Sequence, residues 1–364
     1  MSTADRIKEL EDHLRDAQYN KHTEHAFGVI KAQIARLRDR MESAAAKKLG
    51  GGGFSIKKSG DATVILLGFP STGKSTLLNT LTNAKSKVAA YEFTTLDVIP
   101  GLLEYKHAKI QILDVPGILA GASRGKGRGK EVLAMVRNAD LILIIIDALN
   151  PEQHSAILKE IYDTGVRINK RPPDVKITKK VRGGIDIGST VALTKITRET
   201  ITAILRELRI NNADVLIRTD IDADDLIDAV EGTRRYIPSV TVISKADLLS
   251  KESVDNIIKT IKPDLFVSAE KKINIEKLKE VIFNRLNFIR IYLKEVNKKA
   301  DLEVPMVLKG GATLRSVCEH IHKDFVRKFR FARVWGKSAK FEGQQFRTPD
   351  KALCDGDIVE IHLK

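Results

Sequence analysis

The stretch GFPSTGKS at residues 68–75 decides the fold, because it stands between an apolar run at 62–67 and a helical pattern at 74–81. It matches the pattern G-x-x-x-x-G-K-S in the context that a phosphate-binding loop requires. Glycines let backbone N–H groups close around phosphates at the start of a helix. Lys74 is predicted to reach the β- and γ-phosphates and Ser75 to ligate Mg²⁺. The stretch therefore predicts a P-loop and the α/β sheet that carries one.

A second motif, DVPG at 114–117, follows an apolar run about 40 residues after the loop. Asp114 then lies at the carboxyl end of a strand near the metal, and the Gly117 amide can face the γ-phosphate. Between the two motifs, Thr94 and Thr95 offer hydroxyl groups to Mg²⁺, and Thr95 is preferred; the alternative is an ordinary turn threonine. The predicted metal ligands are Ser75, Thr95 and Asp114, and the predicted catalytic residues are Lys74, Thr95 and Gly117.

Guanine specificity is predicted from SKAD at 244–247, which follows the apolar run 240–243. Asp247 can accept two hydrogen bonds from the N1 and N2 donors of guanine, which adenine lacks, so the rival prediction of an ATPase is disfavoured. Ser268-Ala269-Glu270 is a candidate for the last base-contact loop. The complete predicted nucleotide-binding set is Gly68, Pro70, Ser71, Thr72, Gly73, Lys74, Ser75, Thr76, Asp114, Gly117, Ser244, Lys245, Asp247, Ser268, Ala269 and Glu270.

The organisation of the chain is predicted from periodicity and from breaker residues. Residues 1–53 read as a helical hairpin followed by a glycine linker. The nucleotide-binding domain is predicted at 60–164 and 237–290, ending in a helix at 275–289. Roughly 100 residues separate Asp147 from Lys245, whereas one strand-helix-strand crossover needs about 30, so residues 165–236 are predicted to be an inserted α+β module. Residues 303–364 form a compact tail, with a helix predicted at 314–325.

Composition indicates a soluble globular protein: 43% of the 364 residues are hydrophobic, 30% are charged, and the longest apolar run is far too short to span a membrane. No signal-peptide stretch is visible, so a cytoplasmic protein is expected. Cys318 and Cys354 are expected to be reduced and to bind no metal. A net charge of +15 favours a polyanionic partner, for which RNA, DNA and an anionic membrane are the candidates; a solvated basic surface is the plain alternative. No membrane partner is expected.

The chain resembles the developmentally regulated GTP-binding proteins of the Obg-like superfamily over essentially its full length. The resemblance rests on GFPSTGKS, YEFTTL at 91–96, DVPG running into the glycine-rich basic run 121–129, the insert and the tail. It implies a helix-turn-helix-like hairpin, a ribosomal-protein-S5-like insert and a β-grasp TGS tail. It also implies a Mg²⁺-dependent GTP switch that acts in translation on ribosomes or ribosomal RNA, often with a dedicated partner protein. The rival hypotheses are an RNA- or protein-binding module without relevant turnover and a ribosome-assembly GTPase.

Three positions depart from related enzymes. Ser244 stands where the base motif usually begins with Asn, so a weaker brace between base loop and P-loop, and faster nucleotide exchange, are expected. Ile118 stands where Ras-like enzymes carry the Gln that orients water, which predicts slow intrinsic turnover. Ser71 stands where potassium-dependent GTPases carry Asn, which leaves K⁺ activation open. The basic run 121–130 is either a solvated loop or a nucleotide-gated contact for RNA phosphates or a partner.

Aromatic and cationic residues alternate in the tail between residues 323 and 340. At strand spacing, Phe329, Phe331 and Trp335 are predicted to share a face and to form a core. The alternate strand positions face the other way, so Arg330 is predicted to point outward beside Lys328, where the two cations can hold RNA phosphates.

Overall fold

The computed structural model describes residues 3–18, 20–21, 23–48, 60–82, 99–115 and 135–364. The chain divides into two compact units, one made of residues 1–53 and 170–236 and the other of residues 54–169 and 237–364. None of the described helices is long and apolar enough to cross a lipid bilayer. The predicted fold class, a mixed α/β protein built on a P-loop sheet, is confirmed.

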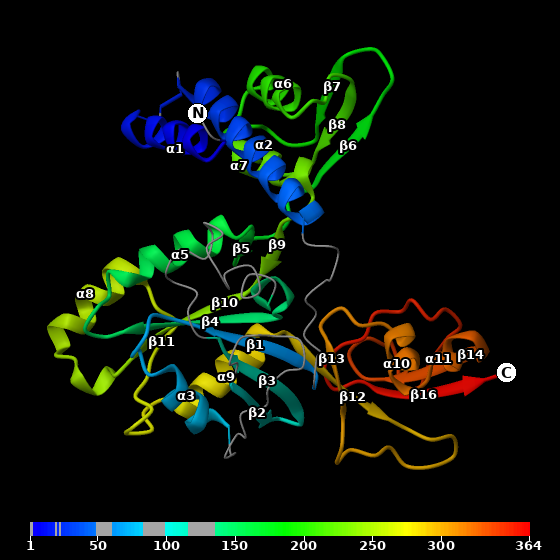
Figure 1. The fold of residues 1–364 in the computed structure, drawn as a ribbon. Helices are drawn as coiled ribbons and strands as arrows, with labels where there is room; N and C mark the ends of the chain where they lie inside the picture. The colour runs from blue at the N-terminus through cyan, green and yellow to red at the C-terminus, as the bar shows by residue number, and fades with distance from the viewer. Residues whose placement is uncertain (1–2, 19, 22, 49–59, 83–98, 116–134) are drawn as a thin grey trace. The chain divides into compact units, whose positions relative to one another are not determined.

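The larger unit is built on a six-stranded sheet with the order β11-β10-β4-β1-β3-β2 (Figure 1). All neighbouring strands are parallel except β2 and β3, which form an antiparallel hairpin. The strands are β1 (Ala62–Leu67), β2 (Ile99–Tyr105), β3 (Ala108–Asp114), β4 (Leu141–Asp147), β10 (Ser239–Ser244) and β11 (Leu265–Phe266). Its helices are α3 (Lys74–Leu81), α5 (Gln153–Asp163), α8 (Lys251–Ile261) and α9 (Ile275–Arg285), and the short strand β5 spans Val166–Ile168.

Both faces of the sheet are buried, as the continuous apolar strands require. Alternate residues of β1 and β4, such as Leu66 and Leu143, join a core with α3 and α9 on one face. The residues between them, such as Ile65 and Ile144, join a second core with α5 and α8 on the other face. This double packing fixes the carboxyl ends of β1, β3, β4 and β10 along one edge, where ligands bind in parallel sheets.

The smaller unit joins the N-terminal helices to the inserted segment. Its elements are α1 (Thr3–Asp16), α2 (Glu24–Lys48), β6 (Val175–Lys179), β7 (Ile185–Ser189), α6 (Arg198–Glu207), β8 (Ala213–Ile217), α7 (Ala223–Glu231) and, at its end, β9 (Arg235–Ile237). A three-stranded sheet runs in the order β6-β8-β7. Ala32 and Ala35 of α2 belong to the same core as Ile201 and Ile204 of α6. The two segments therefore fold around one core rather than as separate modules.

Polar contacts reinforce this joint core at its rim. The Lys31 ammonium lies 2.7 Å from the Asp224 carboxylate, and the Thr197 amide donates to Glu24 over 3.0 Å. A Cβ at Gly28 would stand 2.9 Å from a methyl carbon of Thr200, so α2 and α6 approach closely only because this residue lacks a side chain.

The C-terminal part of the larger unit is a five-stranded sheet with the order β13-β12-β16-β14-β15 (Figure 1). Its elements are β12 (Phe288–Leu293), β13 (Met306–Lys309), α10 (Leu314–Ile321), α11 (Lys323–Lys328), β14 (Phe329–Trp335), β15 (Gln344–Phe346) and β16 (Ile358–Leu363). α10 packs on one face through Leu314 and Val317.

Two helix predictions are wrong at their ends. The helix predicted at 275–289 stops at Arg285, because Asn287 has the left-handed φ of 52° and Phe288 already begins β12. The helix predicted at 314–325 is broken at His322, whose extended backbone separates α10 from α11 and whose side chain accepts a hydrogen bond from the Asp324 amide. In both places a single residue leaves the helical region where apolar periodicity continues.

The aromatic face predicted in the tail is also wrong. Ala332 and Val334 point into the core that α10 covers, and Phe329 packs against the same core. The pairing of β14 with β16 shifts register between Phe329 and Phe331, and this bulge reverses the parity of the strand. Phe331 and Trp335 therefore lie on the other face from Phe329.

Candidate functional site

The phosphate loop is the turn between β1 and α3. Gly73 has φ 84°, a conformation that glycine adopts at little cost, and Ser71 also has a positive φ of 64°. A Cβ on Gly68 would stand 2.5 Å from the Ile145 carbonyl oxygen, so only glycine lets the loop leave β1 beside β4. The loop that the sequence predicts is therefore held by backbone geometry at the N-terminus of α3, where amide groups favour phosphate.

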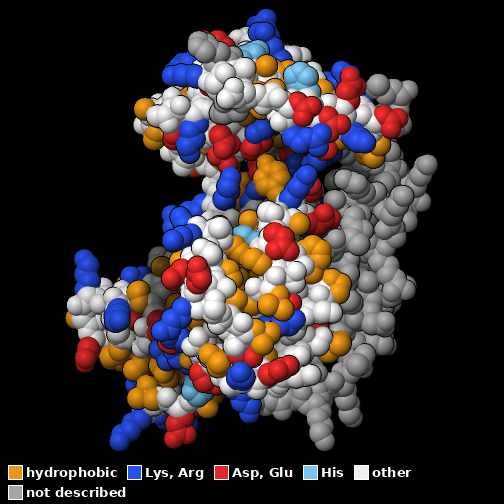
Figure 2. All heavy atoms as spheres, turned by 90° about the vertical axis from the view of Figure 1, so that its left-hand side faces the viewer, with side chains coloured by type: hydrophobic (Ala, Val, Ile, Leu, Met, Phe, Trp, Pro, Cys, Tyr) orange, Lys and Arg blue, Asp and Glu red, His pale blue; other side chains and the backbone are white. Residues whose placement is uncertain are grey.

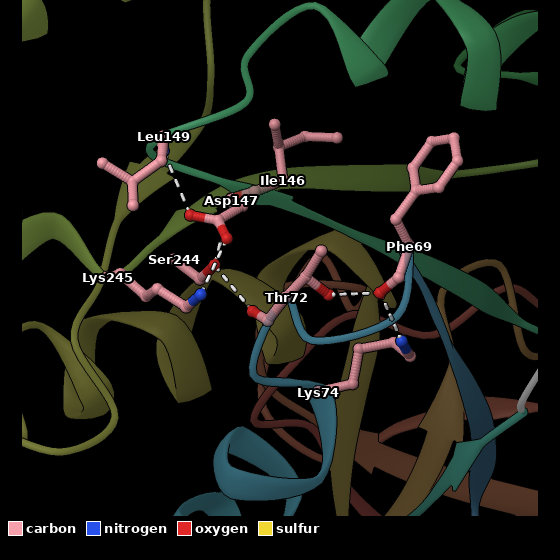
Figure 3. Close-up of polar contacts among 8 residues, drawn as sticks. All are labelled: Phe69, Thr72, Lys74, Ile146, Asp147, Leu149, Ser244 and Lys245. Carbon is pink, nitrogen blue, oxygen red and sulfur yellow. Dashed lines mark hydrogen bonds and ion pairs between the residues drawn. The ribbon is translucent and has the colours of Figure 1, made fainter.

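The side chains of this loop converge on one carbonyl group. Lys74 Nζ donates to the Phe69 oxygen over 2.8 Å, and Thr72 Oγ1 donates to the same oxygen over 2.9 Å (Figure 3). Burial lowers the pKa of Lys74, and the nearby Asp114 carboxylate opposes that shift. A half-buried ammonium group within the loop can neutralise phosphate charge where water screens it poorly.

Ser75 and Asp114 form the candidate metal site. Ser75 Oγ donates to Asp114 Oδ2 over 2.7 Å, and Asp114 is only 5% exposed at the carboxyl end of β3. The other carboxylate oxygen, Oδ1, is buried and has no hydrogen-bond partner among the described residues. Hydroxyl and carboxylate oxygens are the ligands that Mg²⁺ prefers, directly or through water, so this pair fits the ion. In the described part of the chain no group of three or more His, Cys, Asp or Glu side chains suggests another metal site.

Several predicted residues lie outside the described part of the structure. They are Thr94, Thr95, Gly117 and Ile118, together with the basic run 121–130. Their assignment rests on the sequence alone. The exposed Pro70 and Thr76 lie in the phosphate loop and at the start of α3, as predicted from the motif.

The base motif follows β10 as a short 3-10 turn (Ala246–Leu248). Lys245 has φ 54° and its Nζ lies 2.7 Å from Asp147 Oδ2, while Asp147 Oδ1 accepts from the Leu149 amide over 3.0 Å (Figure 3). The Ala246 amide donates to the Val267 carbonyl group, which ties the turn to the end of β11. The carboxyl ends of β4, β10 and β11 thus hold the base motif.

Asp247 is positioned by the loop that contains Ser268. A hydrogen bond from the Ser268 side chain is the main cause that lowers the pKa of Asp247, and Lys271 contributes through an ion pair at 3.4 Å. Ser268 is itself buried and exchanges two backbone hydrogen bonds with Ile273. The structure brings Asp247 and Ser268 together, whereas Ala269 packs against the core and Glu270 is exposed to solvent. Asp247 is therefore an ionised acceptor at neutral pH, as recognition of guanine requires.

Ser244 links the base motif to the phosphate loop. Its Oγ lies 2.8 Å from the Thr72 carbonyl oxygen and 3.1 Å from that of Ile146, so one hydroxyl group contacts both the phosphate loop and β4 (Figure 3). The residue is 6% exposed. The two halves of the candidate nucleotide site are thus joined by a buried hydrogen bond.

Comparisons with known proteins identify the family. Family models match a 50S ribosome-binding GTPase domain at residues 63–179, the C-terminal region of that domain at 182–288 and a TGS domain at 289–363. The chain is 43% identical to a developmentally-regulated GTP-binding protein 1 homolog of Dictyostelium discoideum, over all of both chains. The chain belongs to the family of developmentally regulated GTP-binding proteins. It is accordingly a GTP-binding protein with a P-loop GTPase domain, in a family that usually requires Mg²⁺.

Further GTP-binding proteins and one solved structure are similar to this chain. An uncharacterized GTP-binding protein of Methanocaldococcus jannaschii is 51% identical over all of this chain and 94% of the relative. The developmentally-regulated GTP-binding protein 1 of Xenopus laevis is 43% identical over all of this chain and 99% of the relative. Among solved structures, the YchF GTPase of Schizosaccharomyces pombe has a TM-score of 0.45 and 14% identity, with 84% of this chain and 99% of that chain covered.

In this developmentally regulated GTP-binding protein Ser244 does brace the base motif against the phosphate loop, and a brace weaker than that of Asn stays a prediction. The serine hydroxyl reaches the Thr72 carbonyl group because the last residue of β10 lies directly beside the phosphate loop. A longer side chain is not needed for the contact. We therefore expect Asn at this position to replace the brace rather than to add one.

Removing the hydroxyl group should accelerate nucleotide release. Ser244→Ala deletes one buried hydrogen bond, worth about 1 kcal/mol, so we expect release of a fluorescent GDP analogue to become about fivefold faster in stopped-flow measurements. Ser239→Ala is the matched control, because Ser239 lies at the other end of β10 and accepts a hydrogen bond from Asn169. It should lower the melting temperature without changing release; equal release rates in both variants would show that Ser244 braces nothing.

Two site residues of the developmentally regulated protein were not predicted from sequence. Asp147 holds Lys245, and Lys271 holds Asp247. The signal for Asp147 was present, because an acidic residue ends the apolar run 141–146 at the edge where the other motifs lie. The turn that brings Lys271 back to Asp247 has no comparable mark in the sequence.

Proposed function

We propose that the protein hydrolyses GTP slowly in a Mg²⁺-dependent reaction and cycles between GTP- and GDP-bound states. The observation that carries the proposal is the meeting of Lys74, Ser75 and Asp114 at the carboxyl edge of the sheet. Mg²⁺ bound there would offset the charge that develops on the β- and γ-phosphates. Lys74 would bind phosphate oxygens, and Ser75 and Asp114 would hold the ion. Ile118 supplies no polar group to orient water, which is why turnover is slow in this proposal.

Phosphate release under multiple-turnover conditions tests the proposal. With excess GTP and Mg²⁺, released phosphate should exceed the amount of protein, and EDTA should stop it. Ser75→Ala should reduce Mg²⁺-dependent turnover about tenfold or more. Thr80→Ala, which removes a hydroxyl group bonded only to the Thr76 carbonyl oxygen of its own helix in the described structure, should have no effect. Release that never exceeds one phosphate per protein would favour the rival, a binding module that uses GTP as a structural ligand. Whether K⁺ accelerates the reaction is measured in the same assay.

We further propose that the GTP-bound protein acts on the ribosome, in the cytoplasm, and that ribosomal RNA contributes to the contact. The matching family model is described as a 50S ribosome-binding GTPase, and the chain carries a net charge of +15. On the face drawn in Figure 2, Lys and Arg side chains are interspersed with Asp and Glu rather than gathered in one uniform patch. Contacts by small groups of cations are thus the form of RNA binding that this face supports. Assembly of the ribosome, rather than translation, is the second candidate role, and a dedicated partner protein is a further expectation from the resemblance.

Exposed cations of the TGS domain provide the test. Lys328, Arg330 and Lys337 are exposed at the start and end of β14. Replacing all three with Glu should lower cosedimentation of the full-length protein with ribosomes about tenfold, and wild-type cosedimentation should fall as salt rises. GTP affinity should stay unchanged.

A matched charge reversal serves as the control. Lys251, Lys259 and Lys277 are exposed on α8 and α9, so their replacement with Glu changes the net charge equally. This variant should still cosediment. Cosedimentation that ignores salt and both sets of changes would contradict an RNA contact through the TGS domain.

A further inference from the structure

The TGS sheet has one face packed on α10 and an opposite face that carries aromatic and charged side chains. On β12, Ile289, Ile291 and Leu293 point to the α10 core. Tyr292, and Lys294 directly after the strand, therefore lie on the opposite face. On β16, Val359 and Ile361 pack in the same core, so Glu360 and His362 lie on the opposite face. We call the set Lys294, Phe331, Arg333, Trp335, Glu360 and His362 the outer-face cluster.

Two rings of the outer-face cluster form a stack across neighbouring strands. Phe331 and His362 are direct partners in the pairing of β14 with β16. Their ring centroids lie 4.1 Å apart with an interplanar angle of 17°. Both side chains are partly exposed, and the Arg330 guanidinium group lies 5.8 Å from the Phe331 ring centre. A parallel pair of flat rings flanked by a cation is a surface on which a further planar ring can stack.

Glu360 organises the charged part of the cluster. Its side chain is 2% exposed although it lies outside the α10 core, and a buried carboxylate is costly unless it is paired. It binds Lys294 directly, lies 2.7 Å from His362 Nε2 and lies 3.8 Å from the Arg333 guanidinium group. Burial alone would raise the pKa of Glu360, but the hydrogen bonds from Lys294 and His362 outweigh it and lower the pKa. Glu360 therefore stays ionised and fixes the orientation of His362.

The remaining members make the surface cationic and aromatic rather than apolar. Lys294 lies 5.0 Å from the centre of the Trp335 ring, and the Arg333 side chain is 48% exposed. On β12 and β13, the same sheet face is covered, because Phe288 and Val307 pack into the core of the GTPase domain. The outer-face cluster is thus the part of the face that the GTPase domain leaves uncovered among the described residues.

We propose that the outer-face cluster binds single-stranded RNA, with an unpaired base stacked on the Phe331–His362 pair and backbone phosphates held by Arg333 of the cluster and by the neighbouring Arg330. The argument is one of complementarity: a flat ring pair matches a base, and adjacent guanidinium groups match phosphates. Duplex RNA offers no free base face, so the site distinguishes single strands from duplexes. The proposal deepens the ribosomal role and rests on it for its biological setting.

The single tryptophan of the chain provides a direct signal, because Trp335 belongs to the cluster. Full-length protein is titrated with oligouridylate of about ten nucleotides and with a duplex RNA of equal length. We expect the single strand to quench Trp335 fluorescence and the duplex to bind at least about tenfold more weakly. Phe331→Leu, which keeps an apolar side chain but removes the ring, should weaken binding of the single strand about tenfold.

Phe329→Leu is the matched control, because Phe329 lies on the same strand but packs toward the α10 core. It should leave the affinity for the single strand unchanged, and circular dichroism should show both variants folded. Equal affinity of Phe331→Leu and wild type for the single strand would overturn the proposal, as would a preference for the duplex. Ribosome cosedimentation is measured with the same proteins. If it persists while oligouridylate fails to bind, the stacking site is wrong and the ribosomal role stands; loss of all ribosome binding in the wild type would reject that role separately.

Discussion

Asp247→Asn will turn the protein from a guanine-binding into a xanthine-binding one. The carboxylate is placed by Ser268 and Lys271 to accept hydrogen bonds, and an amide in its place can accept only one of the two that guanine offers. Hydrogen bonds to a charged group are each worth about 1.5–3 kcal/mol, so affinity for GTP should fall about a hundredfold. Xanthosine triphosphate carries an oxygen at C2 that can accept from the new amide, so its affinity should rise. Competition against a fluorescent GTP analogue measures both changes.

The control is Asp255→Asn, because Asp255 is exposed on α8 and makes the same change of charge away from the base motif. Its affinities for GTP and xanthosine triphosphate should match those of the wild type. Should Asp247→Asn keep wild-type affinity for GTP, the base would have to bind elsewhere. ATP should compete poorly with GTP in the wild-type protein.

The phosphate loop and the buried strand before it could be predicted because they depend on local sequence. A run of buried strand residues followed by GFPSTGKS predicts a strand, a phosphate loop and a helix in that order. The positive φ at Gly73 belongs to the backbone conformation of this loop. Asp114 and Ser244 end parallel strands, so their meeting at one edge of the sheet follows from the fold class. Local patterns together with the parallel fold therefore place these motif residues at one edge of the sheet.

What could not be predicted depends on single residues and on distant contacts. Asn287 and His322 leave the helical region without any change in hydrophobic pattern, so the helix ends were misplaced. One bulge in β14 reversed the faces of Phe331 and Trp335. The common core of α2 and α6 joins Ala32 to Ile204 across a large part of the chain, which periodicity within either segment cannot reveal. The brace at Ser244 depends on a 2.8 Å contact of its hydroxyl group with the Thr72 carbonyl oxygen, which lies far away in the sequence.

Lys74→Ala should abolish tight GTP binding while leaving the protein folded. The ammonium group is held within the phosphate loop by the Phe69 carbonyl group, and burial lowers its pKa, which shows that the fold bears a cost to keep the charge there. Removing it forfeits charge-assisted hydrogen bonds to two phosphates, and we expect the Kd for GTP to rise about a hundredfold or more. Because the buried charge disfavours the folded state, the melting temperature without nucleotide should not fall.

Equilibrium titration with a fluorescent GTP analogue and thermal unfolding without nucleotide together test this prediction. Asn79→Ala is the control, since Asn79 is exposed on the same helix beyond the phosphate loop, and it should change neither quantity. A Kd for Lys74→Ala within about threefold of the wild type would mean that phosphate is not bound by this loop. A large fall in melting temperature would instead mean that Lys74 stabilises the folded loop. Loss of GTP binding would then follow from loss of structure rather than from loss of phosphate contacts.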